Sequence, residues 1–212
     1  MSAPIAIAFD RVGAAACKVF VAPTRDARGE DALRASGTVG FECEIAQLRE
    51  RPLPAVVADR SNLESVRRMK NEWQDAYYSS GRVVRQQAGQ WTEVRLGSEA
   101  RAPTDPFWTL HAARGFTADT AATLASGSWE LSGHIDLRRA GHLTRDFGIG
   151  ALRASLLRSS SWERNIPAVV ELEPSGRLSS IAYSRATAGS VLWLRLDLYA
   201  YGDVSPPTMP TL

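Results

Sequence analysis

Histidines are the first residues to consider for acid–base or metal chemistry, because imidazole titrates near neutral pH. The sequence has three, His111, His134 and His142, and none has a partner at the spacing of a catalytic triad or a metal site. His134 alternates with Glu130 and Asp136, which favours a surface position. The histidine pattern therefore predicts no metal centre.

His111 differs because it lies among the apolar residues Phe107, Trp108 and Leu110, in a segment typical of a helix. Its side chain can face an interior cavity there, although a histidine packed in the core or at its rim is the commoner case. Tyr183 can supply one directed hydrogen bond from an otherwise apolar pocket wall. We take His111 and Tyr183 as the candidate catalytic residues and leave the packing role open for both.

Carboxylates and thiols form no further pattern that is typical of a catalytic or metal site. Glu42 and Glu44 fall on one face of a predicted strand, where a solvated outer face is favoured over an acid–base pair. Cys17 and Cys43 form no metal motif, and a disulfide between them requires an oxidising compartment. The chain carries no G-x-S-x-G, H-E-x-x-H, P-loop or dinucleotide fingerprint. We expect no cofactor and no metal.

Composition excludes further classes of protein. The 212 residues carry a formal net charge of +2, and the short basic runs at 67–70 and 138–145 are followed or interrupted by acidic residues, which argues against a nucleic-acid partner. No segment approaches the ~20 apolar residues of a membrane span. The lipobox-like run 14–17 lacks the basic n-region of a signal peptide, and Asp10 and Arg11 interrupt the apolar stretch before it. If Met1 is the native start, a cytoplasmic location is expected.

Aromatic residues recur through the predicted strands and the first central helix. Each one alone favours ordinary core packing, but together they are typical of a pocket for an apolar ligand with a few polar groups. We predict that the pocket is lined by Phe41, Tyr77, Trp91, Phe107, Trp108, Trp129 and Trp193.

Helices and strands are predicted from hydrophobic periodicity and from turn residues. The small apolar residues 4–21 predict a helix that ends at Pro23, followed by a loop over 24–32. Alternation over 39–45 predicts a strand with Phe41 on its buried face. Further strand-like runs cover 53–60, 63–70, 72–79, 82–87 and 90–96.

The second half of the chain mixes helices with strands. Thr104 or Asp105 can cap a helix that Gly115 stops, and alanines predict a second helix over 117–126. A strand over 129–137 has Trp129 on its buried face, and residues 140–158 predict an amphipathic helix with Leu143 toward the core. Three strands follow at 166–173, 177–185 and 190–201, the last burying the leucines of 192–198, and then an extended tail over 203–212.

This order predicts one mostly-β (α+β) domain, with helices covering one side of an antiparallel sheet. Its parts are an N-terminal helix and loop over 1–33, a curved sheet with helices over 34–202 and a proline-rich tail over 203–212.

Six short motifs carry a family resemblance in their order and spacing, at residues 36–39, 83–91, 105–108, 131–137, 166–172 and 175–178. In these the chain resembles the LolA/LolB-like lipoprotein-carrier superfamily, especially its actinobacterial LppX/LprG-like branch. The resemblance implies a half-barrel whose helices plug the concave side and whose acyl ligands lie between sheet and helices. The usual lipoprotein signal of that family is missing here, and a cytosolic pigment-pathway enzyme of the VioE type shares the fold.

Two main functional hypotheses follow. The first is a cytosolic, cofactor-independent cyclase or isomerase of antibiotic biosynthesis, which folds an apolar polyketide-like intermediate and excludes water. The second is a lipid or lipoprotein carrier whose export signal lies outside the sequence. A regulatory or scaffold protein with a collapsed cavity is a third possibility. All but the third predict an apolar small-molecule ligand.

Overall fold

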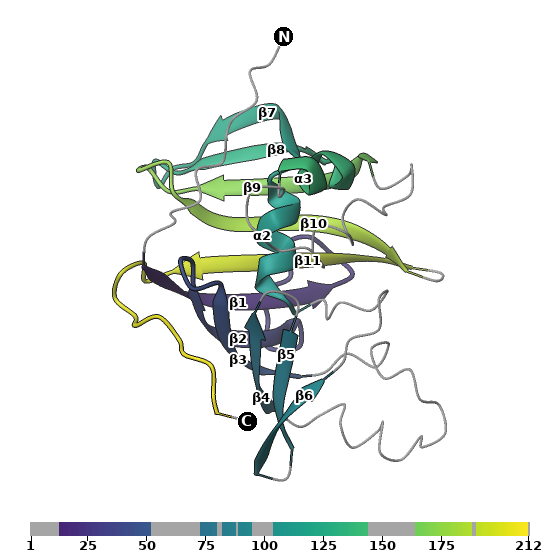
Figure 1. Ribbon diagram of the computed structural model, residues 1–212. Helices are drawn as coiled ribbons and strands as arrows, with labels where there is room; N and C mark the ends of the chain where they lie inside the picture. The colour runs from purple at the N-terminus through teal and green to yellow at the C-terminus, as the bar shows by residue number, and fades with distance from the viewer. Residues whose placement is uncertain are drawn as a thin grey trace.

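A single antiparallel sheet dominates the computed structural model, which describes residues 13–51, 73–79, 82–87, 89–94, 104–143, 164–187 and 190–211 (Figure 1). Its eleven strands lie in the order β6-β5-β4-β3-β2-β1-β11-β10-β9-β8-β7. The strands are β1 (Ala14–Ala22), β2 (Leu33–Gly40), β3 (Ile45–Glu50), β4 (Gln74–Ser79), β5 (Arg82–Gln87), β6 (Gln90–Val94), β7 (Phe116–Thr123), β8 (Trp129–Ile135), β9 (Ile166–Leu172), β10 (Leu178–Thr187) and β11 (Ser190–Tyr199).

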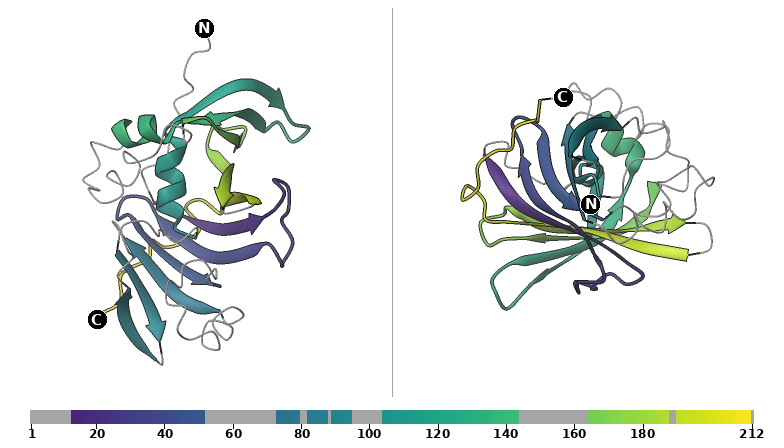
Figure 2. Two further views of the ribbon diagram at one scale, coloured as in Figure 1. Left: turned by 90° about the vertical axis from the view of Figure 1, so that its right-hand side faces the viewer. Right: turned by 90° about the horizontal axis from the view of Figure 1, so that it is seen from below.

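The sheet is an open half-barrel, which confirms the predicted fold class. Consecutive strands pair as meanders, and β1 joins the two halves by pairing with β2 on one side and with β11 on the other. The sheet curves around helix α2 (Pro106–Ala113), while helix α3 (Leu137–Leu143) lies beyond the carboxyl end of α2 (Figures 1 and 2). No helix in the described ranges has the length and apolar character needed to cross a membrane.

The N-terminal helix prediction is wrong where the structure describes the chain, because residues 14–22 form strand β1. The alanines there favour a helix by intrinsic propensity, but every second residue from Ala15 to Val21 belongs to the buried core. That spacing of two, with β-branched Val19 and Val21, suits a strand between two neighbours. Residues 23–32 form the predicted loop.

Two further predictions fail at turns and edges. Residues 41–44 form the turn between β2 and β3 instead of continuing a strand. Glu42 and Glu44 therefore belong to a turn and do not share one face of a strand. Residues 116–123 form the edge strand β7 instead of a helix, because pairing with β8 outweighs the helix propensity of the alanines. The predicted strands at 53–60 and 63–70, and residues 144–158 of the helix predicted over 140–158, lie outside the described residues. The start of that helix falls in the described helix at Leu137–Leu143, where Leu143, predicted to face the core, is 46% exposed.

Most other predictions are confirmed. Strands β4, β5, β6, β8, β9, β10 and β11 and helix α2 fall within a few residues of the predicted positions. The predicted turn at 174–176 joins β9 to β10, with Gly176 at φ +82° and Glu173 N–H donating to the Arg177 carbonyl at 2.7 Å. The tail is extended as predicted, and its buried Pro207 packs against Gly40 beside the Cys43 thiol.

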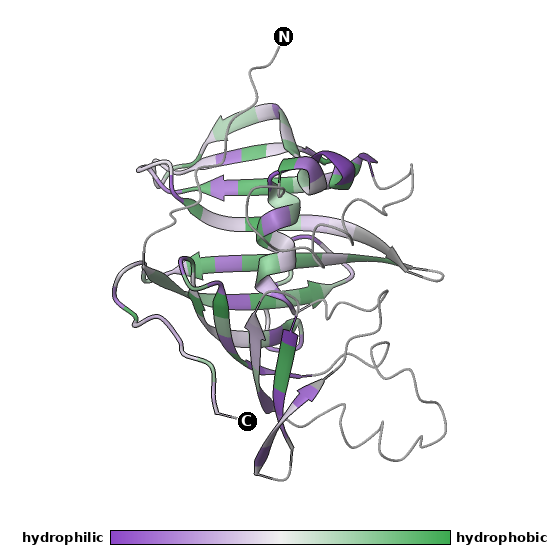
Figure 3. Cartoon of the chain, viewed as in Figure 1, coloured by the Kyte–Doolittle hydropathy of each residue, from purple (hydrophilic) through white to green (hydrophobic). Residues whose placement is uncertain are grey.

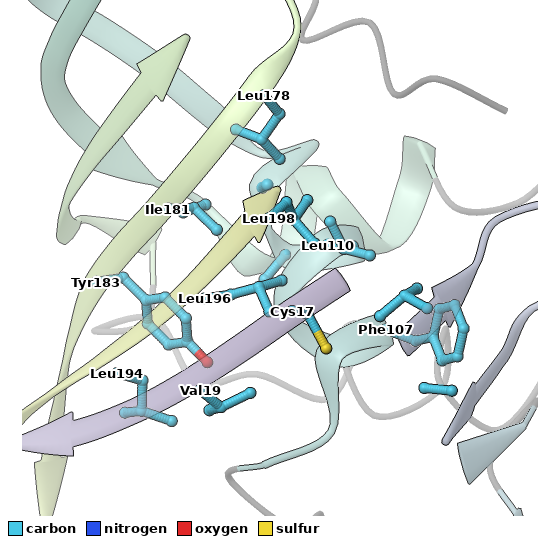
Figure 4. Close-up of a cluster of buried hydrophobic side chains, with 14 of the residues drawn as sticks. Cys17, Val19, Phe107, Leu110, Leu178, Ile181, Tyr183, Leu194, Leu196 and Leu198 are labelled. Carbon is cyan, nitrogen blue, oxygen red and sulfur yellow. The ribbon is translucent and has the colours of Figure 1, made fainter. Parts of the chain in front are cut away.

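Apolar and hydrophilic residues alternate along strands such as β11, as the hydropathy colouring shows (Figure 3). Leu194, Leu196 and Leu198 of β11 lie in the main core cluster, as predicted, and so do Ile181 of β10 and Val19 of β1. These side chains project to one side of the sheet, toward Phe107 and Leu110 of α2 (Figure 4). The concave face is therefore the buried face.

Candidate functional site

Helix α2 is the element that fills the concave side of the half-barrel. Asp105 begins it as the N-cap residue, since its carboxylate accepts hydrogen bonds from the backbone N–H groups of Phe107 at 3.0 Å and Trp108 at 3.4 Å. Seven of its eight residues are buried, so they point in every direction around the helix axis. A helix that is buried all round lies inside the molecule.

The interior between α2 and the sheet is almost entirely apolar. Aliphatic side chains converge there from strands in both halves of the sheet, together with the thiol of Cys17 (Figure 4). The lining includes Val19, Leu48, Val83, Leu131, Val170, Ile181, Leu194, Leu196 and Leu198. These side chains are nearly fully buried and pack as one cluster, so the concave face offers an apolar environment with few groups that bind water.

A polar network stands at the start of α2. The Glu50 side chain on β3 is fully buried, and it accepts hydrogen bonds from Arg85 Nε at 2.8 Å, Tyr78 Oη at 2.5 Å and Thr104 Oγ1 at 2.8 Å. Burial, and next the Glu50 charge, raise the pKa of the Tyr78 phenol well above its usual value. Because Thr104 directly precedes the N-cap residue, the network attaches the start of α2 to β3, β4 and β5.

The candidate catalytic residues both lie on the concave side, but the structure gives them different neighbours. His111 of α2 is buried, with Nε2 3.7 Å from the Glu44 carboxylate in the β2–β3 turn. Glu44 has a φ of +47°, which is rare for a residue with a side chain. Tyr183 of β10 is buried, its hydroxyl 3.4 Å from Thr109 Oγ1 and its ring 5.8 Å from Trp108. Whether either takes part in catalysis stays a prediction.

Three of the predicted lining residues lie around α2. Phe107 is part of the core, Trp108 packs against it, and Phe41 also packs against it while stacking on Tyr201 with a centroid distance of 5.9 Å. These three residues come from α2 and from the β2–β3 turn, so the tertiary fold brings them together.

The other four predicted lining residues lie elsewhere. Tyr77 and Trp91 contact each other edge to face at 5.1 Å on the convex side, because Tyr77 alternates with the buried Ala76 and Tyr78. Trp193 also lies on the convex face, opposite to its leucine neighbours. Trp129 is on the predicted face of β8 but at its open end, where 44% of the residue is exposed.

Sequence reasoning missed the charged side chains of two buried networks, Glu50 with Arg85 and Arg195 with its partners. Glu50 continues the alternation of Ala46 and Leu48, which was a readable signal that its side chain faces the core. Arg195 is buried on the convex face, where it donates to Asp197 at 2.6 Å, Ser180 at 2.8 Å and Glu171 at 2.9 Å. Arg28 of the 23–32 loop also donates to Glu171, at 3.0 Å. This second network ties that loop to the sheet.

Comparison with known proteins gives likenesses of structure. No family model matches the sequence, and neither does any curated protein. The chain is similar to the solved structure of LprF from Mycobacterium bovis, with a TM-score of 0.48 and 12% sequence identity over 94% of this chain and 89% of LprF. It is also similar to the lipoprotein LppX from Mycobacterium tuberculosis, with a TM-score of 0.47 and 11% identity over 91% of this chain and 88% of LppX. For a LolA superfamily protein from Nitrosomonas europaea, the TM-score is 0.37 and the sequence identity is 10%, over 96% of this chain and 90% of that protein.

The half-barrel itself rests on the pairing and curvature of this chain's own strands, independently of those likenesses.

The two thiols are expected to differ sharply in reactivity. Both are free; Cys43 is exposed, whereas burial raises the pKa of the Cys17 thiol to about 12. With Ellman's reagent at pH 8, we expect one thiol per chain to react in the folded protein and two after unfolding in guanidinium. The Cys43→Ser variant should then show no reaction until it unfolds. Two reactive thiols in the folded protein would contradict the buried position of Cys17.

Proposed function

We propose that this protein binds an apolar ligand, with the hydrocarbon character of an acyl chain, between helix α2 and the concave face, and that it acts as a carrier. The observation that supports this most directly is the apolar lining drawn from both halves of an open sheet. Eleven strands extend about 48 Å across at roughly 4.8 Å each, whereas the eight residues of α2 extend only about 12 Å. The helix therefore spans only part of the width of the concave face.

The charges of the site also support a neutral, apolar ligand portion. Glu50 and Arg85 compensate each other's charge, and Tyr78 and Thr104 bond to the same carboxylate. A buried ion pair with all of these bonds formed has little left to offer a charged ligand group. Ligand binding along α2 would thus depend on hydrocarbon burial, at about 0.8 kcal/mol for each CH2 group.

The cyclase hypothesis of the sequence has no supporting observation in the described residues, and neither does its polyketide-like substrate. His111 and Tyr183 face the concave side, where His111 lies beside Glu44 and Tyr183 beside Thr109 and Trp108, and a catalytic role for either stays a prediction. The cytoplasmic location also stays a prediction. The carrier is therefore the function that the geometry supports best.

Quenching of tryptophan fluorescence by a brominated fatty acid tests the proposed site, since bromine quenches only indoles close to it. Trp108 lies on α2 and Trp193 on the convex face, so they form a matched pair. We expect the fatty acid to quench the wild-type protein, Trp108→Phe to remove a large part of that quenching, and Trp193→Phe to remove none. The absence of saturable quenching, or equal effects of the two variants, would overturn the proposal.

Native mass spectrometry of the protein purified from its own organism identifies the natural ligand. A bound phospholipid or acylated lipid supports the carrier. A polyketide-like molecule that the protein converts to a new product would instead restore the cyclase hypothesis.

A further inference from the structure

The turn between β7 and β8 projects from the body of the half-barrel (Figure 2, left). All residues from 119 to 127 are exposed, so this part of the hairpin packs against little else in the protein. Residues 120–129 also contain no ionisable side chain, in a chain in which 23% of residues are charged. The tip therefore has neither the packing of a core element nor the charges of an ordinary surface loop.

Two large apolar side chains occupy this uncharged tip. Leu124 is 37% exposed and Trp129 is 44% exposed. Thr123 and Trp129 are paired across the hairpin, and the Leu124 N–H donates to the Ser128 carbonyl at 2.8 Å. Leu124 and Trp129 therefore occupy neighbouring positions of the β7–β8 ladder, next to the turn. The projecting tip thus presents one large apolar side chain at each of two neighbouring positions of the hairpin, with no charge between them.

The tip is continuous with the apolar interior. Trp129 is on the same face of β8 as the buried core residues Leu131 and Ile135, and it is paired with Leu172 of β9, which is also in the core. An apolar surface thus runs along β8 from the concave face to the exposed indole.

We propose that the β7–β8 tip inserts Leu124 and Trp129 into the surface of a lipid bilayer. An aromatic residue buries about 150–250 Å², so two side chains supply far less than the roughly 800 Å² per partner of a stable protein interface. A fluid lipid surface accepts a narrow projecting tip without a complementary groove, and tryptophan favours the level of the headgroups. The absence of charge over 120–129 removes the cost of desolvating ions there.

The charges behind the tip indicate which lipids it contacts. The nearest acidic groups are Asp119, Glu130, Glu171 and Glu173, while Arg28 and Arg195 are already bonded to Glu171. His134 lies 3.5 Å from Asp119, and Arg177 stacks on the Tyr201 ring. No basic cluster faces the bilayer among these groups. Binding is thus apolar and does not require anionic lipid.

Flotation of the full chain with vesicles of pure phosphatidylcholine tests the contact. We expect the wild type to float with the vesicles, and Leu124→Asp to lower the bound fraction about tenfold or more. Val191→Asp is the matched control, because Val191 is 55% exposed but lies at the opposite end of the strands, and it should float like the wild type.

Each outcome decides the proposal. Failure of the wild type to float, equal floating of Leu124→Asp, or a requirement for anionic lipid would overturn it, and the first result would leave a protein partner as the occupant of the tip. The contact does not rest on the proposed ligand. If the protein floats but shows no fatty-acid quenching, the bilayer contact stands and the carrier function is overturned. If it shows quenching but does not float, the carrier function stands and the bilayer contact is overturned.

Discussion

Replacing Glu50 with alanine is expected to lower the free energy of unfolding by about 3–5 kcal/mol. The carboxylate is the common acceptor for Arg85, Tyr78 and Thr104, and both Glu50 and Arg85 are buried. Its removal leaves a buried guanidinium without its counter-charge and two hydroxyls without their shared acceptor. Urea unfolding monitored by circular dichroism measures the loss.

Two further variants separate the lost charge from the lost hydrogen bonds. Glu50→Gln keeps an acceptor oxygen but not the charge, so it should destabilise less than Glu50→Ala. The double variant Glu50→Leu, Arg85→Met removes both charges and should recover much of the stability, because apolar residues often replace a buried ion pair at little cost. A double variant that is as unstable as Glu50→Ala would show that the uncompensated charge is not the cause.

The same network shows where sequence reasoning succeeds and where it stops. Alternation predicts the leucine face of β11, and the same alternation recurs on β3, where Glu50 follows Ala46 and Leu48 on the core face, yet no strand is predicted there. The pairing of Glu50 with Arg85 and Thr104 is not readable, since it depends on strands β3, β4 and β5 meeting the start of α2. Local pattern thus predicts burial, and tertiary contact decides the partner.

The errors have the same physical origin. Residues 14–22 and 116–123 are rich in alanine and form strands, because hydrogen bonding to neighbouring strands outweighs intrinsic propensity. Trp193 was predicted in the pocket from its residue type, although alternation with the leucines already indicated the convex face. Of the predicted lining, Phe41, Phe107 and Trp108 meet around α2 only through the fold.

Two glycines on the concave side of the sheet lie where the backbones of neighbouring strands approach closely. Gly37 of β2 is paired with the core residue Cys17, and a Cβ added to it would overlap the Gln47 carbonyl oxygen and lie 2.9 Å from Leu48 Cα. Gly133 of β8 has the same relation to Thr117 and Ala118 of the neighbouring strand β7. Backbone atoms of adjacent strands approach closely at these points, as at a bend, and only glycine leaves the space.

The Gly37→Ala variant is therefore expected to lose about 1–3 kcal/mol of unfolding free energy or more. The new methyl group meets backbone atoms of β3, and these can move only if the β2–β3 pairing shifts. Gly29→Ala is the matched control, since a Cβ there meets no atom within 4 Å, and it should change stability by less than about 0.5 kcal/mol. If both variants unfold at the same urea concentration, the close approach at Gly37 does not constrain the half-barrel. If only Gly37→Ala is destabilised, and if it also binds the brominated fatty acid less well, this glycine helps to set the shape of the concave face.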